Sequence, residues 1–147
     1  MNLKPLLPGH VLVSPLRRVP RLHDLSAEEV TDLFLTVQRV SRVIERVFHA
    51  SALNIAIQDG VDAGQSVPHV HAHIIPRKAS DLDDRGGTDA IYQMMQGEEG
   101  DIGNHLVQRQ RRGALPAVDD DDRKPRSDDE MKAEADWLAT EMEKEPE

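Results

Sequence analysis

The sequence has no cysteine, and no apolar run in it is long enough to cross a membrane. Without cysteine the chain can form neither disulfides nor thiolate metal sites. A membrane span needs roughly 20 consecutive apolar residues, and a secretory signal needs an apolar region near the N-terminus. The chain shows neither pattern, so we expect a soluble intracellular protein with no membrane partner. We expect it in the cytoplasm, with the nucleus as a second compartment.

Basic residues are scarce in the second half of the chain. Residues 1–80 hold 9 Lys and Arg against 7 Asp and Glu, whereas residues 81–147 hold 9 against 20. A general nucleic-acid-binding protein needs a basic stripe that neutralises phosphates. We therefore expect no nucleic-acid partner, while the first half suits a small anionic ligand. The glycine motifs of Walker and dinucleotide-binding folds are also missing.

Hydrophobic periodicity predicts one α+β domain, because 147 residues suffice for a single core. Apolar residues alternate, or recur at helical spacing, in segments that Gly, Pro and polar residues separate. The expected elements are a strand at 10–14, a helix at 30–47, a strand at 53–58 and a strand at 69–75 that Pro76 ends. We expect an antiparallel sheet with the long helix packed on it.

Three histidines, His69, His71 and His73, occupy alternate positions of the last expected strand. Strand side chains alternate between two faces, so the three imidazoles would share one face while Val70 and Ala72 point into the core. Sheet stability does not require three neighbouring imidazoles, whose charges repel one another in acid. The row therefore indicates a chemical site.

Two mechanisms can use such a row, and the spacing alone barely separates them. Three histidines can bind a catalytic zinc ion. Alternatively, one neutral imidazole can attack phosphorus while its neighbours hold the phosphate oxygens. The preceding loop, Gly64–Val67, offers backbone N–H groups, an amide and a hydroxyl, which are groups that hold anions. We favour phosphate chemistry on this ground, and keep a metal-dependent hydrolase as the alternative.

The row also carries a resemblance to a known family. Residues 69–75 match the His-φ-His-φ-His-φ-φ signature of the histidine triad superfamily of nucleotide hydrolases and transferases, where φ is apolar. Flanking segments resemble its Fhit branch, the dinucleoside triphosphate hydrolases; they are 8–13, 23–25, 58–60, 63–65, 76–79, 89–92 and 126–131. The similarity spans nearly the whole chain in register.

The resemblance implies hydrolysis of diadenosine 5′,5‴-P1,P3-triphosphate to AMP and ADP. His71 would be the nucleophile, with one ring nitrogen donating to a backbone carbonyl, and it would form a nucleotidyl-histidine intermediate. His69 and His73 would serve the phosphate and its departing oxygen, and His10 would support His69 from behind. The family pattern places Asn2 at the nucleoside sugar; the residues at the phosphates would be Gln58, Gly64, Gln65, Ser66, Val67 and His73.

Composition and periodicity predict the organisation of the chain, and the resemblance implies an assembly. Residues 1–80 would form the histidine triad core, 81–126 an acidic and polar mobile segment, and 127–147 a C-terminal helix of the same domain. Within the mobile segment, residues 89–95 could form a short helix or a turn. Family members are homodimers that join their sheets, so we expect a homodimer. We expect no tightly bound cofactor, although Mg²⁺ or Mn²⁺ can accompany the substrate phosphates.

Other interpretations stay open. Fhit-type proteins begin with additional β-structure, so the N-terminal strands are expected to be missing here and Asn2 would lie near an open edge. A mis-assigned start, a fragment or an inactive truncated paralogue would each explain this. Alternative functions are a nucleoside phosphoramidase or a dinucleoside tetraphosphate-processing relative, either of which would use the same histidines, and a signalling protein that binds the dinucleotide.

Overall fold

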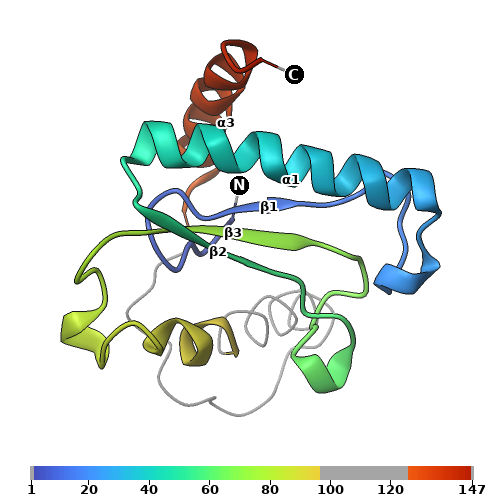
Figure 1. The fold of residues 1–147 in the computed structure, drawn as a ribbon, viewed down its shortest axis with the longest axis horizontal. Helices are drawn as coiled ribbons and strands as arrows, with labels where there is room; N and C mark the ends of the chain where they lie inside the picture. The colour runs from blue at the N-terminus through green and yellow to red at the C-terminus, as the bar shows by residue number, and fades with distance from the viewer. Residues whose placement is uncertain (1, 97–125, 147) are drawn as a thin grey trace.

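The computed structural model describes residues 2–96 and 126–146, and within them it shows a three-stranded antiparallel sheet. The strands are β1 (Val11–Val13), β2 (Ala52–Ala56) and β3 (Ala72–Arg77), in the order β1-β3-β2. Figure 1 shows the sheet between the long helix α1 (Ala27–Phe48) and the segment that follows β3. The α+β fold expected from the sequence, with one long helix on an antiparallel sheet, is confirmed.

Helix α1 begins at a capping box. The Ser26 hydroxyl accepts a hydrogen bond from the Glu29 N–H, and the Glu29 carboxylate accepts one from the Ser26 N–H. Arg17 also binds this carboxylate, and this bond, followed by the one from the Ser26 N–H, lowers the pKa of Glu29 to about 2. One stripe of the helix faces the sheet; its buried apolar residues are Leu33, Val37, Val43 and Ile44. Phe34, which the periodicity also assigns to the stripe, is 47% exposed.

Strand β3 is buried on both faces, which makes it the centre of the molecule. Ala72 and Ile74 pack under α1, as expected from the alternation. Ile75 faces the other side, where it packs with Leu82 and Ile91 of the following segment. That segment contributes a second apolar cluster, so both sides of the sheet are covered (Figure 1).

Pro76 does not end β3, which was a wrong prediction. The strand continues to Arg77, and Pro76 lies opposite Leu53 of β2. The carbonyl of Arg77 accepts a hydrogen bond from the Ser51 N–H, so the neighbouring Pro76 directs its backbone away from β2. Pairing with β1 ends at Ile74. The N–H that proline lacks would therefore have no β1 residue to bind, and the proline is tolerated.

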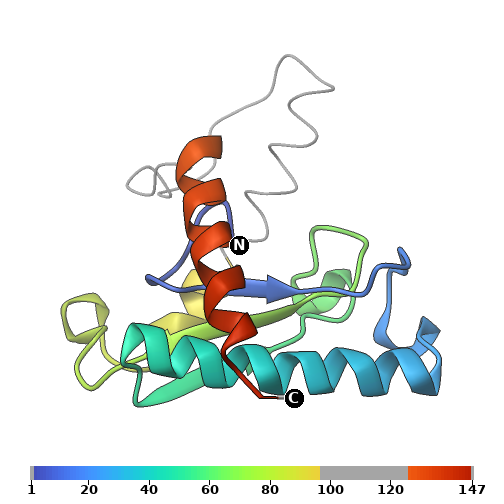
Figure 2. The same ribbon diagram turned by 90° about the horizontal axis from the view of Figure 1, so that it is seen from above.

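Helix α3 (Asp128–Glu143) confirms the expected C-terminal helix, including a capping box at Ser127. It crosses α1, as Figure 2 shows from above. Arg39 and Arg46 of α1 donate to carbonyl oxygens at its C-terminal end, which compensates the negative end of the helix dipole. Trp137 packs edge-on against Phe48, with ring centroids 5.5 Å apart.

The segment expected to be mobile is described only in part. Residues 90–96 are helical, so the short helix predicted at 89–95 is present. Residues 97–125 lie outside the described residues, and the mobility of 81–126 stays a prediction. None of the helices in the described ranges is apolar enough over sufficient length to cross a membrane.

Candidate active site

The histidine row lies at the start of β3 rather than within it. The strand begins at Ala72, so only His73 is a strand residue, while His69 and His71 belong to the chain that leads into it. The expectation that one strand carries all three was therefore wrong. The rings of His71 and His73 nevertheless lie close together, with centroids 5.0 Å apart and planes at 67° to each other.

The ring of His71 is oriented by the main chain. Its Nδ1 atom lies 2.8 Å from the carbonyl oxygen of His69. A carbonyl only accepts hydrogen bonds, so Nδ1 carries the proton and Nε2 carries the lone pair. This is the bond expected of the nucleophile, and the contact confirms that geometric expectation. The catalytic role of His71 itself stays a prediction.

His10 determines which ring nitrogen of His73 carries the proton. The Leu6 N–H donates to Nδ1 of His10, at 3.2 Å, so the ring proton of His10 is on Nε2. That Nε2 lies 3.0 Å from Nδ1 of His73 and donates to it. The proton of His73 is therefore on Nε2. Both rings are almost completely buried, with exposed fractions of 0% and 1%.

This pairing corrects the expected place of His10. The family pattern suggested that His10 stands behind His69, whereas the structure places it against His73. The reason is strand register: β1 pairs directly with β3, and Leu12 lies opposite His73. His10, two residues before Leu12, can therefore reach the same ring from the same face of the sheet.

The ring of His69 is positioned by the main chain of Val19. The Val19 N–H donates to Nδ1 of His69, at 3.3 Å, and the Val70 N–H donates to the Val19 carbonyl at 2.8 Å. Because Nδ1 accepts, the proton of His69 is on Nε2. The Nε2 atom of His71 therefore has a lone pair, whereas the Nε2 atoms of His69 and His73 carry protons.

Two loop residues predicted at the phosphates, Gln58 and Gly64, pack against each other. Gly64 has a φ of +95°, and a Cβ atom there would lie 2.5 Å from Nε2 of Gln58. Only glycine allows both this backbone conformation and this close approach. The Oε1 atom of Gln58 is buried and has no hydrogen-bond partner among the described residues. An unpaired buried acceptor is costly, and a ligand that donates a hydrogen bond would satisfy it.

Gln65 supports the loop through both ends of its side-chain amide. Its Oε1 accepts from the Gly60 N–H at 3.0 Å, and its Nε2 donates to the Pro20 carbonyl at 2.8 Å. These bonds give Gln65 a structural role. The neighbouring Val67 carbonyl accepts from the His69 N–H at 2.7 Å, which positions the row. Contacts of Gln65, Ser66 and Val67 with a substrate stay predictions.

Asn2, predicted at the nucleoside sugar, lies beside His10 in the structure. Its side chain is 1% exposed, and its amide nitrogen lies 3.4 Å from Nδ1 of His10. Its Oδ1 accepts from the Lys4 N–H. In this arrangement Asn2 supports His10, and its contact with a nucleoside stays a prediction.

Comparisons with known proteins assign the family. The HIT domain model matches residues 1–80. The chain is 52% identical to the Schizosaccharomyces pombe bis(5′-nucleosyl)-tetraphosphatase [asymmetrical] over 94% of this chain and 80% of that protein. It belongs to the HIT-domain family.

Two further relatives agree with this assignment. A Dictyostelium discoideum bis(5′-adenosyl)-triphosphatase is 54% identical over 67% of this chain and 64% of its own length, so the chain spans less than two thirds of that protein. The crystal structure of Plasmodium falciparum diadenosine triphosphate hydrolase in complex with Cyclomarin A superposes with a TM-score of 0.54. It is 36% identical over 76% of this chain and 71% of that chain.

A strand-end arginine such as Arg77 of this HIT-domain protein is usually solvated, but the structure shows otherwise. Its side chain is buried, and its guanidinium makes two bonds to the Asp81 carboxylate, at 2.8 and 2.9 Å. It also donates to Oδ1 of Asn54 at 2.6 Å. Arg77 thereby joins β2 and β3 to the segment that covers the second face. The acidic residue four positions later was the available sequence signal.

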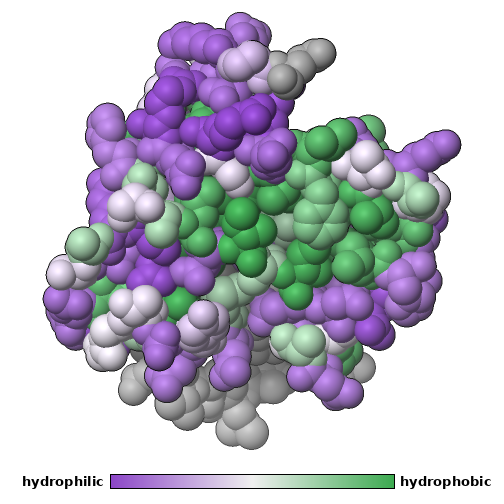
Figure 3. Space-filling view, in the orientation of Figure 1, coloured by the Kyte–Doolittle hydropathy of each residue, from purple (hydrophilic) through white to green (hydrophobic). Residues whose placement is uncertain are grey.

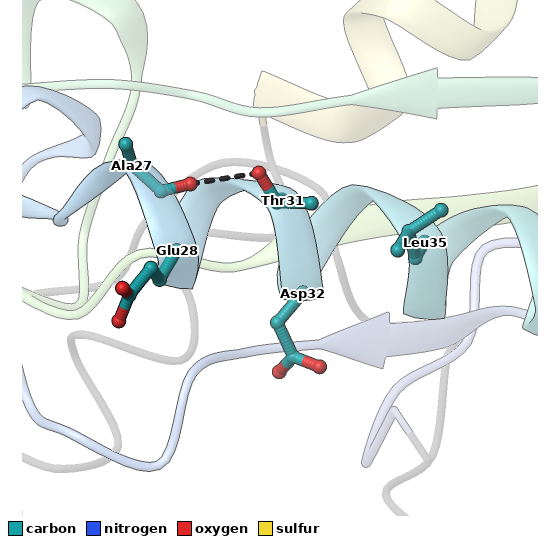
Figure 4. Close-up of a pocket in the computed structure, with 5 residues that line it drawn as sticks. All are labelled: Ala27, Glu28, Thr31, Asp32 and Leu35. Carbon is teal, nitrogen blue, oxygen red and sulfur yellow. Dashed lines mark hydrogen bonds between the residues drawn. The ribbon is translucent and has the colours of Figure 1, made fainter.

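A hollow on α1 lies apart from the histidines. It has a volume of about 400 Å³ and is lined by Ala27, Glu28, Thr31, Asp32 and Leu35 (Figure 4). The only bond among these side chains drawn there runs from the Thr31 hydroxyl to the Ala27 carbonyl. Neither the histidines nor the loop residues of the candidate site line it, so we assign it no catalytic role.

The proton pattern also bears on the metal alternative. Zinc needs the lone pair of each ligating imidazole, whereas the Nδ1 atoms of His69 and His73 already accept hydrogen bonds and their Nε2 atoms carry protons. Within residues 2–96 and 126–146, no group of three His, Cys, Asp or Glu side chains is placed to hold a metal ion.

Proposed function

We propose that the protein hydrolyses dinucleoside polyphosphates, cleaving diadenosine 5′,5‴-P1,P3-triphosphate to AMP and ADP. The observation that supports it most directly is the proton pattern of the row. Nε2 of His71 has a lone pair because Nδ1 donates to a carbonyl, and the histidines on either side in the sequence carry Nε2–H donors. Attack on a phosphate needs such a nucleophile and such donors to the phosphate oxygens.

The proposed reaction has two displacements at one phosphorus atom. The lone pair of His71 forms an N–P bond to the α-phosphorus, the bond to the bridging oxygen breaks, and ADP leaves. Water then attacks the same phosphorus, the N–P bond breaks, and AMP leaves with an oxygen from that water. The Nε2–H groups of His69 and His73 would stabilise the negative charge that develops on the phosphate and the departing oxygen.

An isotope experiment tests this proposal. The protein is incubated with diadenosine triphosphate and Mg²⁺ in ¹⁸O-water, and the label should appear in AMP and not in ADP. When a reaction with substrate labelled at the α-phosphorus is quenched with alkaline denaturant, the label should remain on the protein as a phosphoramidate that acid releases. His71→Asn should keep the fold and bind the dinucleotide, but lose turnover by several orders of magnitude. A His71→Asn rate within tenfold of wild type would refute the nucleophile.

The same assay separates the alternatives. Faster turnover of an adenosine phosphoramidate than of the dinucleotide would favour a phosphoramidase. Activity that chelator abolishes, and that zinc but not Mg²⁺ restores, would favour a metal-dependent hydrolase. The two curated relatives described above carry triphosphatase and tetraphosphatase names. Comparing the turnover of substrates with three and four bridging phosphates would therefore determine which phosphate-chain length this protein prefers.

We also propose that the protein is a homodimer in which sheets join at β2. Among the described residues β2 pairs with β3 only, so its other edge is open. Apolar side chains gather over α1 and the sheet beneath it (Figure 3). Three large exposed ones belong to these elements: Phe34, Leu35 and Ile55. An apolar surface beside an open strand edge is suited to a second copy of the chain.

A further inference from the structure

Segment 19–22 runs along the loop that leads to the histidine row and is bonded to it at each step. Val19 binds His69 and Val70, and the Pro20 carbonyl accepts from Gln65. The Leu22 N–H donates to Oδ1 of Asp59 at 2.8 Å. These bonds come mainly from the main chain of the segment, so its position decides whether they form.

Arg21 supplies the charged contact of this segment. Its Nη2 donates to Oδ2 of Asp59 at 3.3 Å, and its Nε lies 3.2 Å from Oδ1. The guanidinium lowers the pKa of the Asp59 carboxyl, mainly through this bond, so the pair is ionised at neutral pH. One carboxylate therefore binds both the Arg21 side chain and the Leu22 main chain.

The flat guanidinium also lies against Gly60. A Cβ atom at Gly60 would come within 3.0 Å of Cζ of Arg21, and the φ of Gly60 is +107°. The Gly60 N–H in turn binds Gln65, whose amide reaches back to Pro20. Arg21 is thus packed on the residue where the loop turns, as well as bonded to Asp59.

We infer that Arg21 is a positioning residue of the proposed hydrolase, which with Asp59 holds segment 19–22 so that the Val19 N–H keeps the proton of His69 on Nε2. This inference deepens the proposed function and rests on it. Without the Val19 donor, the ring of His69 could place its proton on Nδ1 instead. Its Nε2 would then offer a lone pair to the phosphate oxygens, which repels them.

The chain offers a matched control for this role. Arg42 of α1 pairs with Glu145 at 3.0 Å, and the side chains of Arg21 and Arg42 are equally exposed, at 43%. Arg42 contacts the C-terminal end of the chain and none of the loop residues. Exposed ion pairs of this kind contribute little to global stability. Arg21→Gln and Arg42→Gln should therefore have similar melting temperatures and differ at the site.

Two measurements test the inference. Long-range ¹H–¹⁵N spectra of the substrate-free protein report which ring nitrogen of each histidine carries the proton. Wild type and Arg42→Gln should show His69 protonated on Nε2, whereas Arg21→Gln should populate the Nδ1–H form. Turnover of Arg21→Gln should fall about tenfold or more with KM changed less, because the donor acts on the transition state. Arg21→Lys keeps the charge but loses the planar contact, and should recover part of the rate.

The outcomes distinguish this inference from the proposed function. If the proton of His69 stays on Nε2 in both Arg21 variants, or if Arg21→Gln turns over within twofold of Arg42→Gln, the positioning role is refuted. Should Arg21→Gln not fold, the spectrum of Arg21→Lys decides the point. If the wild type cleaves no dinucleotide, the proposed function fails, while the spectra still decide whether Arg21 sets the proton of His69.

Discussion

The Nε2 atom of His10 lies 3.0 Å from Nδ1 of His73, and the pair is closed to solvent. The proton between them belongs to His10, because the Leu6 N–H already occupies the other nitrogen of that ring. A fully buried residue thereby decides which nitrogen of the His73 ring carries the proton. The centroids of the two rings lie 5.2 Å apart, and the ring planes are tilted by 41°.

Substitution of His10 should therefore lower activity through His73. His10→Phe leaves the Leu6 N–H and Nδ1 of His73 without this partner in a buried place, at a cost of about 1–3 kcal/mol for each unpaired group. We expect turnover to fall about a hundredfold, measured in single-turnover assays at a temperature where the variant is folded. His23→Phe is the control, because the side chain of His23 is 70% exposed. Equal rates for the two variants would contradict this role of His10.

Substitution of Gly64 should displace Gln58. Gly64→Ala places a methyl group 2.5 Å from the Gln58 amide at a φ of +95°. The left-handed conformation costs about 1–2 kcal/mol for alanine, and the clash adds to this. Gly86→Ala carries the strain alone, since its φ is +104° and a Cβ atom there has no neighbour within 4 Å. We expect both variants to be destabilised in thermal unfolding, and Gly64→Ala alone to lose catalytic efficiency.

The Arg77–Asp81 pair should make the free energy of unfolding depend on pH in the acidic range. The Arg77 guanidinium lowers the pKa of the Asp81 carboxyl, chiefly through its hydrogen bonds. The contribution is therefore complete above the ordinary aspartate pKa of about 3.9 and is lost as pH falls through the lower folded value. Asp81→Asn leaves the buried guanidinium without its charged partner and should cost about 3 kcal/mol at pH 7.

Urea unfolding at a series of pH values checks this prediction. Between about pH 5 and 2 the free energy of unfolding should fall more steeply for wild type than for Asp81→Asn. Asp83→Asn is the control, because Asp83 is exposed. Parallel pH profiles for wild type and Asp81→Asn would show that the pair does not couple to folding.

If the protein is a dimer joined at β2, a single charge introduced on that strand should dissociate it. Ile55→Lys, on the open edge strand and 49% exposed in the single chain, should give a monomer in sedimentation velocity runs. Leu16→Lys alters a fully exposed leucine that lies outside β2 and α1, and should leave the dimer intact. A wild-type chain that sediments as a monomer at micromolar concentration would refute the proposal.

Local signals in the sequence predicted what is local in the structure. A serine followed three residues later by glutamate marks the capping boxes at Ser26 and Ser127, and apolar alternation marks Val70, Ala72 and Ile74; each signal depends on neighbours within a few residues. The donor bond of His71 was also predictable, because it joins residues two positions apart. These features do not depend on how the strands pair.

The errors come from contacts that register and tertiary packing decide. His10 could be assigned to His69 or His73 until the pairing of Leu12 with His73 was known. Arg77 belongs to a charged class that is usually exposed, and its burial follows from a segment that folds back over β3 and brings Asp81 with it. Val19 contributes main-chain groups, which no side-chain pattern reveals.

The protons of the row trace back to main-chain groups, through the His10 side chain in the case of His73: the N–H groups at positions 6 and 19 and the carbonyl at position 69. Every amino acid supplies a carbonyl, and every one except proline supplies an N–H. Evolution can therefore vary the side chains at positions 6 and 19 to suit the core without disturbing the chemistry. Proline at either position is the one replacement that would erase a donor while leaving all the histidines in the sequence.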